Sequence, residues 1–423
     1  MCAAATVQQN PQKPQKAMLP LQDAVQKLLD AVVPLTQVQW VHTLDADGRV
    51  LAQDVTSGLS VPSCDNSAMD GYAVASQDVT TTPTTLPVSQ RIPAGSQPVA
   101  LQQGTAARIF TGAQIPPGAD AVVIQEDCTA REDAAGASLV DIHKAPKVGL
   151  SIRRTGEDVA LGSVVLRSGD RLGPAQLGLA ASVGMDQLPV CPRPRVALFS
   201  TGDELIMPGT VPPAEMPPGA IYNSNRYFLA SLLRRLGCEV TDFGIIPDQR
   251  DATLAVLRDA ARSHNVILTS GGVSVGEEDH VRPAVQSLGS LDNWLVAIKP
   301  GKPFAHGRIG DTHFLGLPGN PVSSLITFLV LVRPFLLRLQ GVRQVQPRAF
   351  ELPAHFEWLR ADRRQEFLRV RINDQGGLDL FPNQSSGVLT SAVWGDGLVD
   401  NPPTQVIRHG DRVRFLSFTE LMA

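Results

Sequence analysis

The chain is poor in cysteine, in large aromatic residues and in net charge. Its five cysteines stand at positions 2, 64, 128, 191 and 238 and form no CxxC pair. We therefore expect reduced thiols, without a disulfide framework or a cysteine metal site. Only three tyrosines and four tryptophans are present, and the net charge is −4. Neither a base-stacking surface nor a bulk attraction to nucleic acid or an anionic membrane is expected.

The chain also lacks an unbroken apolar run of membrane-spanning length. Its most apolar stretch, Val322–Leu339, is interrupted by Arg333 and Pro334, which favours a core helix over a membrane span. Residues 1–17 have no long apolar core, so we expect a disordered tail and not a signal peptide. With 43% hydrophobic and 18% charged residues, the composition is that of a soluble globular protein. We expect a cytoplasmic location.

The first half of the chain predicts a mixed domain with an insertion. Helical spacing of apolar residues covers Leu19–Val33, and a second helix is predicted at Ala175–Val183. Between them, residues 55–150 consist of short β-prone runs separated by glycine and proline. We predict a mixed α/β domain of residues 18–54 and 151–190, into which a mostly β domain of residues 55–150 is inserted.

The second half predicts an α/β domain and a small β domain. Residues 191–340 alternate between strands and helices, which favours a parallel-type sheet covered by helices. The predicted elements are the strands Val196–Ser200, Val240–Ile246 and Asn265–Leu268 and the helices Ser224–Leu236 and Gln249–Ser263. Residues 341–423 contain a hairpin signal, with Glu366–Ile372 and Leu378–Phe381 as its strands. The fold class is therefore multidomain α/β plus β.

The segment Thr269–His280, TSGGVSVGEEDH, follows a short apolar strand. Its glycines, Gly271, Gly272 and Gly276, allow positive φ and close approach of the backbone to a ligand. Successive N–H groups of such a loop can form an anion-binding concavity, and the carboxylates that follow are oxygen ligands of the kind Mg²⁺ prefers. The alternative is a glycine-rich turn with a solvated acidic end.

Two more loops follow predicted strands within about fifty residues of this one. The first, KPGKP, carries Lys299 and Lys302, which are candidate cations for phosphate or an oxyanion. The second, GLPGNPVS, places Asn320 at a helix N-cap and Pro321 at its first position. Free N–H groups there would favour an anion, although a helix start without a ligand fits equally well.

Three further segments are candidates for the same chemistry. FSTGDEL, from Phe199 to Leu205, and Asp248 follow the ends of two predicted strands, where ligands bind in open α/β sheets. Taken singly, these residues fit caps of turns and helices. CDNSAMDGYA, from Cys64 to Ala73, and IFTGA, from Ile109 to Ala113, fit either ordinary turns or a site.

Taken together, these motifs resemble those of the molybdopterin molybdenumtransferases, the family that includes the E domain of gephyrin. DNSAMDGYA, IFTGA, FSTGDEL, SGGVSVGEED, KPGKPF and GLPGNPVS stand in the order of that family, and the resemblance runs from about Leu19 to the C-terminus. It implies an enzyme that inserts molybdate into adenylylated molybdopterin with Mg²⁺-dependent release of AMP. It also implies a homodimer with the site at the subunit interface, and a molybdopterin adenylyltransferase and acceptor molybdoenzymes as partners.

The resemblance also implies roles for individual residues. The catalytic residues would be Asp70, Thr111, Glu204, Asp248, Asp279 and Lys299. The metal ligands would be Glu204, Asp248 and Asp279. The residues that bind the pterin nucleotide and the oxyanion would be Ser200, Thr201, Gly202, Gly271, Gly272, Ser274, Gly276, Lys302, Pro318, Gly319, Asn320, Pro321, Arg369 and Ser386.

One position departs from the family pattern. Leu295 stands where the family commonly has a second basic residue, four positions before Lys299. Either another cation such as Lys302 or Arg369 covers the oxyanion, or molybdate binds more weakly. Alternative functions are the adenylyltransferase, which resembles the α/β domain alone, and a gephyrin-like scaffold. The residues do not discriminate molybdenum from tungsten.

Overall fold

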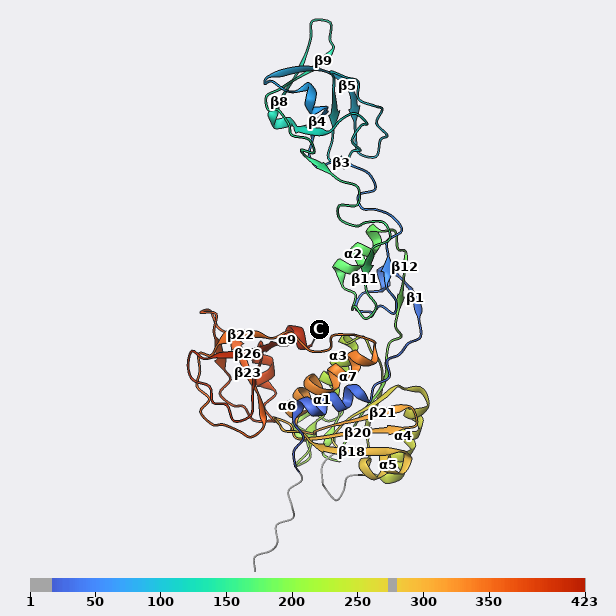
Figure 1. Ribbon diagram of the computed structural model, residues 1–423. Coiled ribbons are helices and arrows are strands. Elements are labelled where there is room, and N and C mark those ends of the chain that lie inside the picture. Colours follow the sequence, from blue (N-terminus) through green and yellow to red (C-terminus); the bar gives the residue numbers. More distant parts are fainter. Residues whose placement is uncertain (1–16, 273–279, 423) are drawn as a thin grey trace, which may run out of the picture. The chain divides into compact units, whose positions relative to one another are not determined.

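The computed structural model describes residues 17–272 and 280–422. The chain forms two compact units (Figure 1). The first comprises residues 1–39, 48–52 and 190–423, and the second comprises residues 40–47 and 53–189. The division predicted from the sequence is finer than this, and its boundaries stay predictions.

The first unit contains a six-stranded sheet in the order β16-β13-β17-β21-β20-β18. Its strands are β13 (Arg195–Thr201), β16 (Glu239–Ile246), β17 (Val266–Ser270), β18 (Ser290–Leu295), β20 (Pro303–Ile309) and β21 (Thr312–Leu317). The first four in that order are parallel, whereas β20 pairs antiparallel with both of its neighbours, β21 and β18. The helices are α3 (Asn225–Arg235), α4 (Arg250–Ser263) and α5 (Val281–Leu288). The predicted α/β alternation is confirmed, and the sheet is mixed at one edge.

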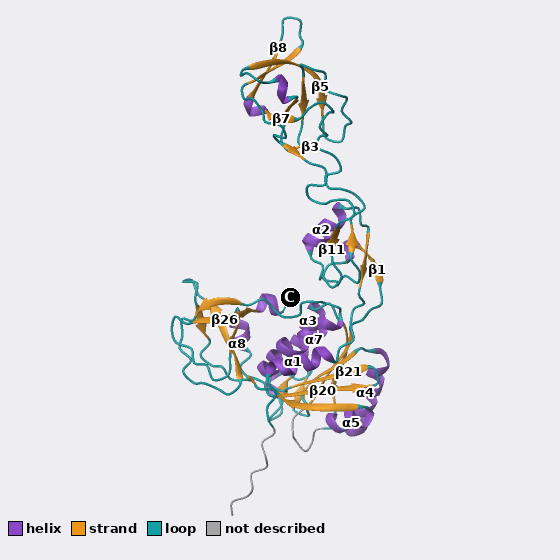
Figure 2. Ribbon diagram, in the orientation of Figure 1, coloured by secondary structure: helices purple, strands orange, loops and turns teal. Residues whose placement is uncertain are grey.

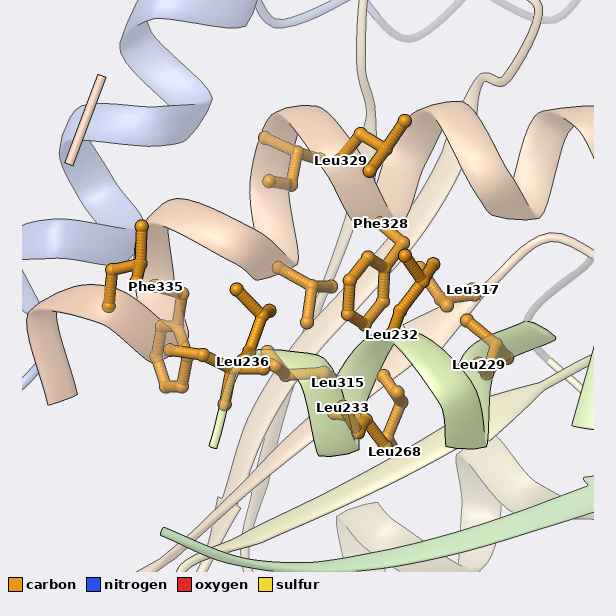
Figure 3. Packing of buried hydrophobic residues seen from close by; sticks show 14 of the residues in the cluster. Leu229, Leu232, Leu233, Leu236, Leu268, Leu315, Leu317, Phe328, Leu329 and Phe335 are labelled. Atoms are coloured by element: carbon orange, nitrogen blue, oxygen red, sulfur yellow. The ribbon is translucent and has the colours of Figure 1, made fainter. Parts of the chain in front are cut away.

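A long apolar helix fills the core above this sheet. It consists of α6 (Pro321–Thr327), a π-helical turn η5 (Phe328–Val332) and α7 (Arg333–Leu339). Its 19 residues have the length and hydropathy of a membrane span, yet 89% of the apolar window is buried. Figure 3 shows its Phe328 and Phe335 among leucines of α3 and of the strands. The prediction of a core helix is confirmed, and the wider π turn accommodates the missing N–H of Pro334.

The first helix, α1 (Leu21–Asp30), belongs to the same core. Ala24, Val25 and Leu28 are buried in the cluster that also contains Phe335 and Leu336 of α7. The sequence placed this helix with residues 18–54 and 151–190, whereas it packs in the first unit. An apolar stripe shows that a helix is buried on one face, but it does not identify the surface that covers that face.

The C-terminal residues form a second sheet in the first unit (Figure 2). Its strands are β19 (Ile298–Lys299), β22 (Phe350–Pro353), β23 (Gln365–Ile372), β24 (Leu378–Leu380), β25 (Gly397–Asn401) and β26 (Arg412–Ser417), with short helices α8 (Thr390–Trp394) and α9 (Phe418–Leu421). The predicted hairpin is confirmed, since β23 and β24 pair antiparallel. The edge strand β19 comes from the α/β region and pairs parallel with β23, which sets Lys299 opposite Glu366.

The second unit is built around another six-stranded sheet, in the order β7-β4-β6-β5-β9-β8. Its strands are β4 (Gly71–Val74), β5 (Thr84–Ile92), β6 (Ala106–Ile109), β7 (Ala121–Ile124), β8 (Cys128–Glu132) and β9 (Ser138–Ile142). Two-stranded ladders join β1 (Gln39–His42) to β12 (Gln187–Val190), β2 (Val55–Thr56) to β11 (Val164–Leu166), and β3 (Asn66–Ser67) to β10 (Ile152–Arg153). The predicted second helix is present as α2 (Pro174–Ser182). The predicted fold class of α/β plus β is confirmed.

Two histidines are buried side by side under α7. His306 on β20 and His313 on β21 stack with ring centroids 5.8 Å apart, and the ring of Phe335 lies 4.9 Å from that of His313. Nδ1 of His313 has no hydrogen-bond partner among the described residues. Burial lowers the pKa of His313 to about 4 and also lowers that of His306. Both rings therefore fold in the neutral form.

We predict that this burial makes the first unit sensitive to acid. Between about pH 6.5 and pH 4 the unfolded chain binds a proton at His313 that the native state does not, so stability falls as the pH falls. The loss reaches about 3 kcal/mol at roughly 1.4 kcal/mol per pKa unit. Urea unfolding of wild type and His313→Phe, followed by tryptophan fluorescence from pH 7 to pH 4, measures it. The variant should have the shallower pH slope, with the exposed His143→Gln as control; equal slopes would contradict the assignment.

Candidate functional site

A cavity of about 640 Å³ opens in the first unit at the carboxyl ends of the parallel strands. Its walls come from the segments after β13, β16, β17 and β21, from the loop between β19 and β20, and from the C-terminal residues. The antiparallel strand β20 begins where β21 ends, so the lysine loop reaches the same edge. This is the position at which open α/β sheets bind ligands.

The glycines after β17 are required by space as well as by backbone conformation. Gly271 and Gly272 have φ of 91° and 66°, which disfavours other residues. A Cβ on Gly271 would lie 2.8 Å from the carbonyl oxygen of Thr201, and one on Gly272 would lie 2.6 Å from Val281. The backbone of β17 thus passes close to that of β13, which leaves this wall of the cavity lined by main chain.

Lys299 is held by three side chains of the C-terminal region. Its Nζ donates to Oε1 of Glu366 at 2.9 Å and lies 3.3 Å from Oδ2 of Asp362, and it sits 5.7 Å from the ring centroid of Trp358. Glu366 is only 1% exposed, and its Oε2 accepts from Nε1 of Trp358 at 2.8 Å and from Nδ2 of Asn401 at 3.4 Å. The lysine therefore has a fixed position in the cavity wall.

Arg364 brings a second fixed cation to the wall. Its guanidinium donates two hydrogen bonds to Asp362, from Nε to Oδ1 at 2.9 Å and from Nη2 to Oδ2 at 2.8 Å. The hydrogen bonds from Arg364, with a further contribution from Lys299, hold the pKa of Asp362 far below its ordinary value. Asp362 is therefore ionised at neutral pH. Lys302, on the same loop as Lys299, is exposed and also lines the cavity.

Two carboxylates, Glu204 and Asp248, line the same cavity. Gly202, which precedes Glu204 by two residues, has a φ of 139°, and a Cβ there would lie 2.5 Å from Oε2 of Glu204. The carboxylate thus folds back over the chain at the end of β13. Among the described residues no group of three or more histidine, cysteine or carboxylate side chains could hold a metal. Two hard oxygen donors fit a cation that takes its remaining ligands from phosphate and water.

Most of the site residues expected from the sequence come together in this cavity. The predicted residues that line it are Thr201, Gly202, Glu204, Asp248, Gly271, Gly272, Lys299, Lys302, Pro318, Gly319, Asn320 and Ser386. They come from segments up to 185 residues apart in the chain, so their convergence is a property of the fold and not of local sequence.

Five predicted residues are described but lie outside the cavity lining: Ser200, Pro321, Arg369, Asp70 and Thr111. Ser200 is fully buried, with its Oγ 3.2 Å from that of Ser270. Pro321 begins α6, whose first available N–H, that of Val322, donates to the carbonyl of Ser386 at 2.9 Å. That helix start therefore offers an anion less than the sequence suggested, because the protein itself satisfies the first donor.

Arg369 supports the cavity from behind. It is 1% exposed, and its guanidinium donates to Ser391 Oγ and to the carbonyls of Phe367 and Ser385. Burial lowers the pKa of Arg369 to about 10, so it remains charged at neutral pH. The side chain of Arg369 anchors the loop that contributes Ser385 to the lining. The partly exposed guanidinium of Arg364, by contrast, belongs to the lining itself.

The remaining predicted residues fall elsewhere. Asp70 and Thr111 belong to the second unit, where Oδ1 of Asp70 accepts from both N and Oγ1 of Thr111 at 2.7 Å. These bonds lower the pKa of Asp70. Ser274, Gly276 and Asp279 lie outside the described residues.

Several lining residues were not singled out as site residues. They are Pro300, Gly301, Pro303, Ser323, Arg364, Gln384 and Ser385. The prolines and Gly301 belong to the KPGKP motif, so a signal for them was present. Arg364 lies in the run RRQEFLR, residues 363–369, directly before β23. The pairing of β19 with β23, which brings this run to the cavity, cannot be predicted from the sequence.

Comparison with known proteins assigns the chain to a family. Residues 19–184 match the MoeA N-terminal region (domain I and II), residues 197–338 a probable molybdopterin binding domain, and residues 351–418 the MoeA C-terminal region (domain IV). The molybdopterin molybdenumtransferase of Haemophilus influenzae is 40% identical over 367 residues, covering 86% of this chain and 89% of that protein. This chain belongs to the molybdopterin molybdenumtransferase family.

Other members extend the agreement to structure. Molybdopterin molybdenumtransferase 2 of Mycobacterium tuberculosis is 39% identical over 384 residues, covering 88% of this chain and 90% of the relative. The crystal structure of the molybdopterin biosynthesis MoeA protein of Pyrococcus horikoshii OT3 superimposes with a TM-score of 0.81 at 26% identity and covers 95% of this chain. The family predicted from the six motifs is confirmed, and the chain is a transferase of molybdenum cofactor biosynthesis.

We predict that Glu366→Gln destabilises the first unit by about 1–3 kcal/mol, the cost of an unsatisfied buried polar group. Glu366 accepts from Lys299 on one oxygen and from Trp358 and Asn401 on the other. An amide has one acceptor, so its NH₂ must face a donor in either orientation. Denaturant unfolding measures the loss.

A double variant tests this explanation. Trp358→Phe removes one of the opposing donors, so Glu366→Gln should cost less in that background than in wild type. Glu357→Gln, an exposed glutamate beside Trp358, serves as the control for a lost charge. Additive costs for the two changes would show that the opposed donors are not the cause.

Proposed function

We propose that the protein inserts molybdenum, taking molybdate and adenylylated molybdopterin and releasing AMP with Mg²⁺. The observation that carries the proposal is the composition of one cavity. Lys299, Lys302 and Arg364 supply cations, Glu204 and Asp248 supply carboxylates, and a glycine-lined backbone wall completes it. A phosphate-bearing pterin, an oxyanion and a divalent metal need these three kinds of surface together.

The cations, the carboxylates and the backbone of the cavity wall have different roles in this reaction. The lysines and Arg364 attract the molybdate dianion and neutralise phosphate oxygens. Glu204 and Asp248 hold Mg²⁺, with Asp279 as the third carboxylate that the family resemblance implies. When bound, the ion offsets phosphate charge and polarises the anhydride. The close approach of β13 and β17 at Thr201 and Gly271 leaves room for the nucleotide to lie against the main chain.

The C-terminal sheet favours the insertase over the adenylyltransferase. The latter works as a lone α/β domain, whereas here Arg364, Gln384, Ser385 and Ser386 of the C-terminal region form one wall of the cavity. A site that required only the α/β sheet would have no use for this wall.

We further propose a homodimer in which Asp70 and Thr111 of one subunit complete the site of the other. Their mutual hydrogen bonds leave the second oxygen of Asp70 for a ligand. The partners in sequence would be a molybdopterin adenylyltransferase, which supplies the substrate, and apo-molybdoenzymes, which receive the product. A cytoplasmic location fits this exchange.

The test is turnover by the purified protein. Adenylylated molybdopterin, Mg²⁺ and molybdate should give AMP, seen by chromatography, and should reconstitute an apo-molybdoenzyme. Omission of molybdate or addition of EDTA should stop both. Tight binding of the nucleotide without AMP release would indicate a binding module, and adenylylation of molybdopterin from ATP would indicate the earlier enzyme.

We predict that Lys299→Met lowers the rate of AMP release by roughly 100-fold, the usual effect of removing one fixed charge from an active site. The methionine keeps an unbranched apolar side chain but loses the charge over Trp358 and no longer donates to Glu366 or to the oxyanion. Lys144→Met, at an exposed lysine of the second unit, is the control. Full activity of the Lys299 variant, with unchanged thermal unfolding, would remove Lys299 from the proposed mechanism.

A further inference from the structure

Asp362 forms ion pairs with both fixed cations of the cavity, Lys299 and Arg364. Its Oδ1 accepts from Nε and its Oδ2 from Nη2 of Arg364, and Oδ2 also lies 3.3 Å from Nζ of Lys299. Both cations line the cavity. The planar fork of a guanidinium that matches a carboxylate also matches two oxygens of a tetrahedral oxyanion. Asp362 therefore binds where a ligand anion would bind.

The two carboxylates on Lys299 differ in what else holds them. Glu366 is buried and accepts from Trp358 and Asn401 as well as from the lysine, so moving it would leave buried donors unpaired. The side chain of Asp362 is 21% exposed. Within the described part of the chain, the backbone N–H of Arg364 is its only donor besides the two cations. Moving Asp362 therefore costs less than moving Glu366, so Asp362 is the partner that an incoming anion can displace.

The balance of positive and negative side chains around the cavity requires that Asp362 release the cations before an anion binds. The three cations of the lining, Lys299, Lys302 and Arg364, stand against Glu204 and Asp248 of the lining and the two carboxylates that hold Lys299. Without a bound metal, carboxylates outnumber cations, and a dianion gains little by approaching. Displacing Asp362 frees two cations for the same ligand.

We propose that Asp362 is an internal counter-anion that the oxyanion must displace from Lys299 and Arg364, so that Asp362 sets the affinity for the oxyanion. The inference rests on the proposed function, because it takes molybdate as the ligand of these cations. It makes Asp362 a residue that limits the affinity for the oxyanion, so its removal should strengthen binding. A carboxylate that only stabilised the fold would weaken binding when removed.

The experiment is a calorimetric titration of the full-length protein with molybdate alone. Asp362→Asn keeps an acceptor for the N–H of Arg364 and removes the charge. It should bind molybdate about tenfold more tightly, an effect of the size expected for one like charge at close range. Tungstate, of the same shape and charge, should gain by the same factor. In turnover, KM for molybdate should fall while kcat does not rise.

Controls separate this effect from general changes of charge or fold. Asp411→Asn removes a carboxylate of the same C-terminal region that likewise accepts a backbone N–H, from Arg408, and it should leave molybdate affinity unchanged. Asp362→Ser is a second variant, and thermal unfolding checks that both Asp362 variants fold. Tighter binding in either folded variant supports the proposal.

The outcomes also separate this inference from the proposed function. Unchanged or weaker binding in the folded variants overturns the role of Asp362. If neither wild type nor variant binds molybdate while AMP is still released, the counter-anion is wrong and the insertase stands. If the variants bind more tightly but no protein releases AMP, the anion site stands and the insertase fails.

Discussion

The parallel pairing of β19 with β23 is the constraint on which the site depends. These two short runs set Lys299 opposite Glu366 in register, and the ion pair of 2.9 Å between them joins the α/β region to the C-terminal sheet. Without that pairing the cavity would lack one wall, and Lys299 would be a solvated loop lysine. The buried carboxylate is tolerated because its oxygens are satisfied by three donors.

A second consequence of the β19–β23 pairing is that charged side chains and exposed backbone line the same cavity. The sheet edge supplies glycines and carboxylates from four strand ends, and the C-terminal region supplies Arg364 and the loop held by Arg369. In open α/β sheets the strand ends alone can bind a nucleotide. Here the added wall brings fixed cations, which fits a reaction that must hold an oxyanion beside a phosphate.

Much of the α/β region could be predicted because its apolar runs end in glycine or proline. The strands that begin near Val196, Val240 and Val266 and the helices α3 and α4 were found within a few residues, and most motif residues do share one edge. The partner of α1 and the antiparallel pairing of β20 with β21 and β18 could not be predicted, since packing partners leave no local pattern. Arg364 and Arg369 illustrate the limit: β23 is buried on both faces from Glu366 to Val370, so no alternation shows which arginine reaches the cavity.

The leucine at position 295 can now be considered in the same terms. Leu295 ends β18 opposite Pro303, and its carbonyl accepts from the N–H of Leu19, so this position contributes backbone pairing and no charge. Of the two substitutes that the sequence suggested, Lys302 lines the cavity and Arg369 does not. Lys299 and Arg364 are held in internal pairs with Asp362 and Glu366. Both cations contact the same carboxylate and therefore lie close to each other, so the carboxylates offset their mutual repulsion. In the proposed mechanism an oxyanion takes over that role from Asp362.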